Sequence, residues 1–202
     1  MLSTVQDGGR PELAHLGVPR AGACDPWALA AANTLLGNPA DAAALEITVA
    51  GPELQVLATC VVALAGADLG AHVPEEGRLL PPGAAYLLRG GTRLAFKGGS
   101  GARAYVALPG GIAVPPVLGS AATYLAGGFG GVGGRALRPG DRLRARTPED
   151  RRAAGRRWPE QLPGPAYAGT PIVRVLPGPH GAWFAPDALQ ALVASEWEVG
   201  PQ

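Results

Sequence analysis

Apolar residues along the chain fall into short runs that are separated by glycine, proline and charged residues. Each run has the length of a β-strand, and the residues that follow it are typical of turns. We therefore predict strands at Ala44–Val49, Glu53–Leu57, Cys60–Ala65, Ala84–Arg89, Arg93–Phe96 and Arg103–Leu108. Many strands without alternating helices favour a barrel or a sandwich over a doubly wound sheet.

One helix stands out against this pattern. Asp25 is a good cap for the free N–H groups at a helix start, and Pro26 suits the first helical position. Alanine and leucine dominate the residues that follow, and Gly37 favours a helix end because it accepts a left-handed backbone. We predict a helix between these two signals.

The composition changes between Thr147 and Pro165, where the chain is charged, rich in proline and without periodicity. Such a stretch is typical of a linker or a long loop. Beyond it, Ile172–Leu176 has a strand pattern, and Pro186–Ser195 has apolar residues at helical spacing.

Composition and charge narrow the function classes. The 202 residues are 47% hydrophobic with a formal net charge of +1, so no strong field attracts nucleic acid or an acidic membrane. No apolar stretch approaches the ~18 residues of a membrane span, and the first residues lack a signal-peptide pattern. Cys24 and Cys60 are the only cysteines, and we expect two reduced thiols and a cytoplasmic location.

The segment Thr4–Arg10 combines an amide, a carboxylate and a guanidinium with two glycines. Such a loop brings Gln6, Asp7 and Arg10 close to a small ligand, because glycine allows the backbone to approach it. The alternative is a turn in which Asp7 pairs with Arg10.

Two further carboxylates accompany predicted strands. Glu46 lies among aliphatic residues, so it is either on the wet face of an edge strand or buried with a partner. Asp68 closes an apolar run, which is a common place for a site residue, although a turn-forming aspartate is the simpler interpretation.

Other patterns carry less information. Gly127–Gly134 has phosphate-loop-like glycine spacing but lacks the Lys-Ser/Thr signature, so we interpret it as a flexible loop. The three histidines are scattered, and no Cys/His spacing predicts a metal site. Ser120 is interpreted as a turn serine, since no nucleophile elbow is present.

Five segments in order resemble one known family: TVQDGGR, HLGVPRAGACDPWALAAANTLLGN, AALEIT, ALAGADLGA and ARAYVALPGGIAVPPVLGSAATYLAGGFGG. Together they are similar to the biotin-dependent carboxyltransferase-like family, which includes the C-type subunit of 5-oxoprolinase, allophanate hydrolase subunit 2, the KipA-type regulator and the carboxyltransferase part of urea carboxylase. Ala21 and Cys24 depart from the family's Ser-Gly-Ala-Met-Asp pattern.

The resemblance implies a mainly β fold made of cyclophilin-like β-barrel domains. Residues 1–146 would form the first barrel with its one prominent helix, residues 147–166 a linker, and residues 167–202 the start of a second, incomplete barrel.

The resemblance also implies a function within a complex. We expect the C-type subunit of an ATP-dependent 5-oxoprolinase that converts 5-oxoproline to glutamate. Its partners would be a KipI-like B-type subunit and an A-type lactam hydrolase, ATP being used by the complex. The alternatives are carboxyl transfer from carboxybiotin to urea, and a non-catalytic regulator that binds a KipI-type kinase inhibitor. Fold alone does not separate the three.

The expected site residues follow from the family-like segments. We expect catalytic roles for Asp7, Glu46 and Asp68 and substrate contacts by Gln6, Arg10, Asp25 and Arg103, with no metal.

Overall fold

The computed structural model describes residues 2–147, 151–159 and 172–197. By its internal contacts the chain divides into two compact units, Met1–Ala168 and Gly169–Gln202, and each is described by itself.

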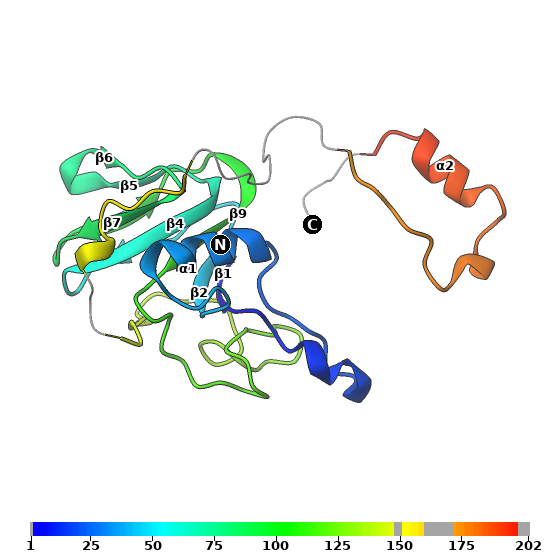
Figure 1. The fold of residues 1–202 in the computed structure, drawn as a ribbon, viewed down its shortest axis with the longest axis horizontal. Helices are drawn as coiled ribbons and strands as arrows, with labels where there is room; N and C mark the ends of the chain where they lie inside the picture. The colour runs from blue at the N-terminus through cyan, green and yellow to red at the C-terminus, as the bar shows by residue number, and fades with distance from the viewer. Residues whose placement is uncertain (1, 148–150, 160–171, 198–202) are drawn as a thin grey trace. The chain divides into compact units, whose positions relative to one another are not determined.

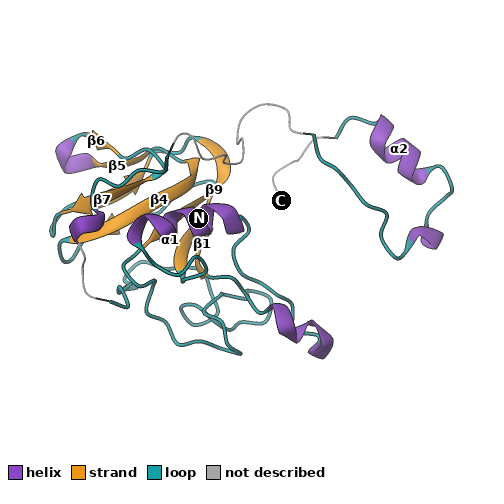
Figure 2. Ribbon diagram, viewed as in Figure 1, coloured by secondary structure: helices purple, strands orange, loops and turns teal. Residues whose placement is uncertain are grey.

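The first unit contains two antiparallel sheets (Figures 1 and 2). The larger has the order β1-β2-β9-β4-β7, with strands Leu2–Gln6, Ala44–Thr48, Ser100–Ala107, Cys60–Asp68 and Ala84–Leu88. The smaller has the order β3-β8-β5-β6, with strands Leu54–Gln55, Arg93–Phe96, Ala71–Val73 and Arg78–Leu79.

Helix α1 (Pro26–Leu36) begins and ends where the sequence predicts. The Asp25 side chain accepts a hydrogen bond from the Ala28 N–H at 2.9 Å, so it caps the first turn. Gly37 ends the helix with φ at 75°, a left-handed conformation that glycine adopts without a Cβ clash. Short 3₁₀ turns lie at η1 (Pro11–Leu16), η2 (Pro74–Glu76) and η3 (Arg151–Ala153).

The larger sheet is buried on both faces. Along β4, Val62 and Leu64 join a core that contains residues of both sheets, and Val61 and Ala63 join a second core under α1. Small side chains dominate this second core: Ala28, Ala31, Ala32, Ala44, Ala63, Ala65, Ala85 and Ala107. The helix therefore lies close to the sheet, which explains why the central strands read as continuous apolar runs.

The prediction of a mainly β chain with one prominent helix is confirmed. The hydrogen-bonded strands of the described residues form two separate sheets and no closed ring. The cyclophilin-like barrel therefore stays a prediction.

Residues 151–159 fall in the stretch that the sequence assigns to a linker, yet they pack on the first unit. Arg157 forms a β-bridge with Ala84, and the N–H of Trp158 donates to the Gly83 carbonyl at 2.7 Å. The rings of Trp158 and Trp27 meet edge to face at 5.3 Å between centroids. Because these contacts cover the open edge of β7 and the flank of α1, this part of the stretch is not a free spacer.

The described part of the second unit contains η4 (Gly181–Trp183) and α2 (Ala188–Ala194). The helix prediction is confirmed there, but Ile172–Leu176 is not a strand. A strand needs a hydrogen-bonded neighbour, and the described residues of this unit provide none. In the described parts of the chain, no helix is long and apolar enough to cross a membrane.

Candidate functional site

Asp7 lies directly after β1, at the point where the chain leaves the larger sheet. Its Oδ1 accepts hydrogen bonds from the Gly9 N–H at 2.8 Å and the Ser120 hydroxyl at 2.6 Å, and its Oδ2 accepts one from the Ala121 N–H at 2.6 Å. A carboxylate has about four acceptor sites, so one on Oδ2 remains for another donor. The alternative interpretation of this turn requires a pair between Asp7 and Arg10. The hydrogen-bond partners of Asp7 are instead Gly9, Ser120 and Ala121.

Arg10 is buried, with 3% of its surface exposed. Its guanidinium donates to the backbone carbonyls of Val117 at 2.9 Å, Ser120 at 3.2 Å and Ala122 at 2.7 Å. It also stacks over the Phe129 ring at 5.0 Å. The charge expected to contact substrate is therefore used to hold the loop around Ser120.

Gln6, like Arg10, is buried and bonded to the loop around Ser120. Its amide nitrogen donates to the Thr4 hydroxyl at 2.9 Å and the Thr123 carbonyl at 3.2 Å. Gln6 and Arg10 thus tie the end of β1 to the same distant loop that holds Asp7.

Glu46 lies in the middle of β2 on the face that α1 covers, and it is buried with partners. Its Oε2 accepts the Tyr105 hydroxyl at 2.6 Å and the Cys24 N–H at 2.8 Å, while Oε1 lies 3.6 Å from Arg103 Nε. Tyr105 in turn accepts the Asp25 N–H at 2.8 Å. These bonds join strands β2 and β9 to the start of α1.

Tyr105 pairs with Glu46 across β2 and β9 and is fully buried. Burial, followed by the hydrogen bond to Glu46, raises the pKa of Tyr105 well above its usual range. The hydroxyl therefore stays protonated at all ordinary pH values and acts as a permanent donor to Glu46.

A cavity of about 140 Å³ lies between the Asp7 loop and the segment before α1. Its lining residues are Asp7, Gly8, Arg20, Ala21, Ala23 and Pro26. The Ala23 N–H donates to the Asp7 carbonyl at 2.9 Å, and the next residue is bonded to Glu46. The segment 21–26 thus connects Asp7 with the Glu46 cluster, which also contains Asp25 and Arg103.

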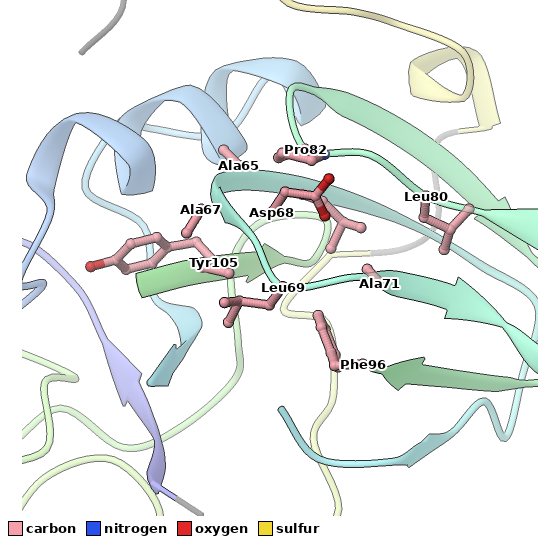
Figure 3. A pocket seen from close by; sticks show the side chains of 11 residues that line it. Ala65, Ala67, Asp68, Leu69, Ala71, Leu80, Pro82, Phe96 and Tyr105 are labelled. Carbon is pink, nitrogen blue, oxygen red and sulfur yellow. The ribbon is translucent and has the colours of Figure 1, made fainter. Parts of the chain in front are cut away.

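Asp68 is placed elsewhere. It is exposed, and its carboxylate accepts the Gly70 N–H at 2.9 Å within its own turn. A hollow of about 10 Å³ lies beside it, and Figure 3 shows the Tyr105 hydroxyl pointing away from the Asp68 carboxylate. Asp68 shares the lining of this hollow with Tyr105, but it is not among the residues that line the cavity beside Asp7. The pairing of β4 with β9 shifts its register between Gly66 and Asp68, directly before this turn.

The glycine-rich segment Gly127–Gly134 is a partly packed loop. A Cβ added at Gly130 would lie 2.0 Å from the Ala122 carbonyl oxygen, and one added at Gly131 would lie 2.0 Å from the Thr123 hydroxyl. Gly130 and Gly131 are therefore needed for close contact with the loop that Arg10 holds, so this part of the segment is packed, whereas Gly128 and Gly133 are exposed.

The described residues contain no group of three or more His, Cys, Asp or Glu side chains that is placed to hold a metal ion. Arg20 is the exposed cation that lines the cavity.

Residues 16–202 match the family described as carboxyltransferase domain, subdomain A and B. The chain belongs to this family. It is 36% identical to the C-type subunit of 5-oxoprolinase from Escherichia coli K12 over 207 aligned residues, which cover all of this chain and 63% of that protein. It is 32% identical to urea amidolyase of Lachancea kluyveri, covering 98% of this chain and 11% of the relative. The chain thus spans less than two thirds of these curated relatives.

Solved structures show the same relationship for this carboxyltransferase-domain chain. The TTHA0988 crystal structure superposes with a TM-score of 0.83 at 39% identity, over 96% of this chain and 38% of that one. Urea carboxylase of Kluyveromyces lactis superposes with a TM-score of 0.69 at 32% identity, over 80% and 15% of the two chains.

Sequence reasoning missed two residues of the site. Tyr105 lies in an apolar strand pattern. The one indication in the sequence was its hydroxyl, which needs a hydrogen-bond partner when the strand is buried. Arg20 lies in a family-like segment, where it follows a proline and precedes Ala21. Ser120 was interpreted as a turn serine, yet its hydroxyl donates to Asp7.

Proposed function

We propose that this chain is the C-type subunit of an ATP-dependent 5-oxoprolinase complex, which opens 5-oxoproline to glutamate. The observation that carries the proposal is the 36% identity to the C-type subunit of 5-oxoprolinase, which extends over the whole of this chain. The cavity beside Asp7 has room for a small amide, because its volume of about 140 Å³ is close to that of a cavity of about 150 Å³ that holds one benzene molecule.

The roles of the chain's own residues follow from their contacts. Asp7 has an acceptor site left for the N–H of a lactam, and its other bonds fix its orientation. Glu46 and Tyr105 position the cavity wall by holding the backbone of Cys24 and Asp25. ATP supplies the complex with an activated carbonyl and a favourable overall free energy. Asp68 has no part in this arrangement.

The proposal includes partners and location. The chain works with a KipI-like B-type subunit and an A-type lactam hydrolase in the cytoplasm. Its two sheets correspond to a cyclophilin-like barrel domain, and residues 167–202 to the beginning of a second.

The test is reconstitution with the A-type and B-type partner proteins and measurement of 5-oxoproline-dependent ATP hydrolysis. The three proteins together are expected to be active and this chain alone inactive. Asp7→Asn should lower activity by at least about tenfold, because the amide nitrogen that replaces one oxygen cannot accept a hydrogen bond.

Asp68→Asn provides the contrast in the same assay. If Asp68 only closes its turn, the variant keeps near-normal activity. A loss as large as that of Asp7→Asn would return Asp68 to the site. Activity of the chain alone, or inactivity of the full set, would contradict the proposal.

Carboxyl transfer to urea is the second candidate, because the chain is 32% identical to urea amidolyase and superposes on urea carboxylase. That reaction needs a biotin carrier and a biotin carboxylase as partners. Urea-dependent consumption of carboxybiotin by the chain would favour it. Tight binding of a KipI-type kinase inhibitor without any turnover would instead favour the regulator.

A further inference from the structure

The cavity beside Asp7 has a charged group of each sign in its lining. Asp7 is half-buried and follows the end of β1, whereas Arg20 is exposed. The Arg20 Nε donates to the Gly8 carbonyl at 3.3 Å, which uses only one of the several N–H donors of a guanidinium. The remaining donors suit a carboxylate, which a guanidinium binds with two parallel hydrogen bonds.

The backbone that carries Arg20 is fixed. Its carbonyl accepts the Arg10 N–H at 2.7 Å, and Arg10 is itself buried. Ala21 adopts φ of 50°, a left-handed conformation that is unfavourable for alanine. A Cβ on Gly22 would lie 2.8 Å from the Gly9 nitrogen, so the two loops that form the cavity are in direct contact. Strained backbone held by its surroundings is a common property of ligand sites.

We propose that Arg20 is a specificity-determining residue, and that the cavity takes a small amide that also carries a carboxylate. The amide N–H donates to the unused acceptor site of Asp7, and the carboxylate pairs with Arg20. Asp7 alone would repel an anionic ligand, and Arg20 offsets that repulsion. The inference rests on the proposed function, and it separates 5-oxoproline, which has a carboxylate, from urea, which has none.

The test compares two ligands that differ only in the carboxylate. Titration calorimetry on the full chain measures the binding of 5-oxoproline and of 2-pyrrolidinone, which is the same lactam ring without the acid group. The wild type is expected to bind 5-oxoproline at least about tenfold more tightly, since a charge-assisted pair is added. Arg20→Gln keeps a donor for Gly8 but removes the charge, and it should reduce the ratio of the two affinities to one or below, because the repulsion from Asp7 is then no longer offset.

Arg89→Gln is the matched control, because Arg89 is also an exposed arginine and is absent from the cavity lining. This variant should keep the wild-type ratio. Raising the salt concentration should lower the wild-type ratio, because salt screens an exposed ion pair, and it should not lower the ratio of Arg20→Gln, in which that pair is absent.

The outcomes distinguish the inference from the proposed function. Three results would overturn the carboxylate site, whether or not the complex hydrolyses ATP. They are a wild-type affinity ratio near one, an unchanged ratio in Arg20→Gln, and no saturable binding of 5-oxoproline up to about 10 mM. If the ratio depends on Arg20 while the reconstituted complex fails to hydrolyse ATP, the carboxylate site stands and the 5-oxoprolinase proposal fails.

Discussion

Removal of the Tyr105 hydroxyl tests whether the Glu46 cluster holds the start of α1. Tyr105→Phe keeps the buried ring but removes the donor to Glu46 Oε2 at 2.6 Å and the acceptor of the Asp25 N–H at 2.8 Å. A hydrogen bond to a charged group contributes about 1.5–3 kcal/mol, and a buried group left without a partner costs about 1–3 kcal/mol. Glu46 retains the Cys24 N–H, so we expect a loss of about 3 kcal/mol in the free energy of unfolding.

Urea denaturation measures this loss, and Tyr86→Phe is the control. The Tyr86 hydroxyl also makes one short bond, to the Pro81 carbonyl at 2.6 Å, but this bond is exposed. Its removal should cost less than about 1 kcal/mol. Hydrogen exchange of the Asp25 amide should accelerate in Tyr105→Phe and not in Tyr86→Phe. Equal losses in the two variants would refute the reasoning.

The pH dependence gives an independent measure of the same group. Burial and the bond to Glu46 raise the folded pKa of Tyr105, whereas a tyrosine in the unfolded chain titrates near about 10. Above that pH the unfolded state releases a proton that the folded state keeps, so stability falls as pH rises. The fall attributable to Tyr105 approaches ~1.4 kcal/mol per pH unit and should be absent from the stability curve of Tyr105→Phe.

Three further predictions concern other parts of the first unit. Gly130→Ala should destabilise the chain by more than about 2 kcal/mol because its Cβ would meet a carbonyl oxygen, whereas Gly133→Ala, which meets nothing within 4 Å, should cost only ~1 kcal/mol by thermal melts. Asp25→Ala should cost about 1 kcal/mol through the lost helix cap, and an unchanged melt would contradict that role. The hydrogen bond from Arg93 lowers the pKa of Glu75 from 4.5 to about 2, so stability should decline as pH falls from 4.5 towards 2. Arg93→Gln should make that decline shallower, and an unchanged pH profile of the melting temperature would refute the pairing.

Features with a local cause could be predicted from the sequence. α1 has its cap, proline and terminal glycine within the segment itself, and β8 (Arg93–Phe96) has its predicted bounds. β1 was missed because Ser3, Thr4 and Gln6 are polar yet buried. Gln6, for example, is satisfied by Thr123, a residue far away along the chain. No local pattern shows such a partner.

The candidate site also combines features with a local cause and features that depend on distant parts of the chain. Asp7, Glu46 and Asp25 were identified from their segments, but their grouping depends on the pairing of strands and on the loop around Ser120. Asp68 has the same local signal as Asp7, a carboxylate at a strand end. Its carboxylate instead closes its own turn, beside a register shift that no sequence pattern showed.

The alanine-rich layer between α1 and the larger sheet has a consequence for ligand affinity. Alanine has no side-chain torsions to lose on folding, and it has no alternative rotamers through which the helix could shift. Gly66 extends this layer, since a Cβ there would lie 2.6 Å from the Arg103 carbonyl oxygen and 3.4 Å from the Ala28 Cβ. We therefore expect the backbone before α1 to move little when a ligand binds. Binding beside Asp7 then involves little ordering of the protein, so the main entropic cost for a small amide is its own loss of translational and rotational freedom.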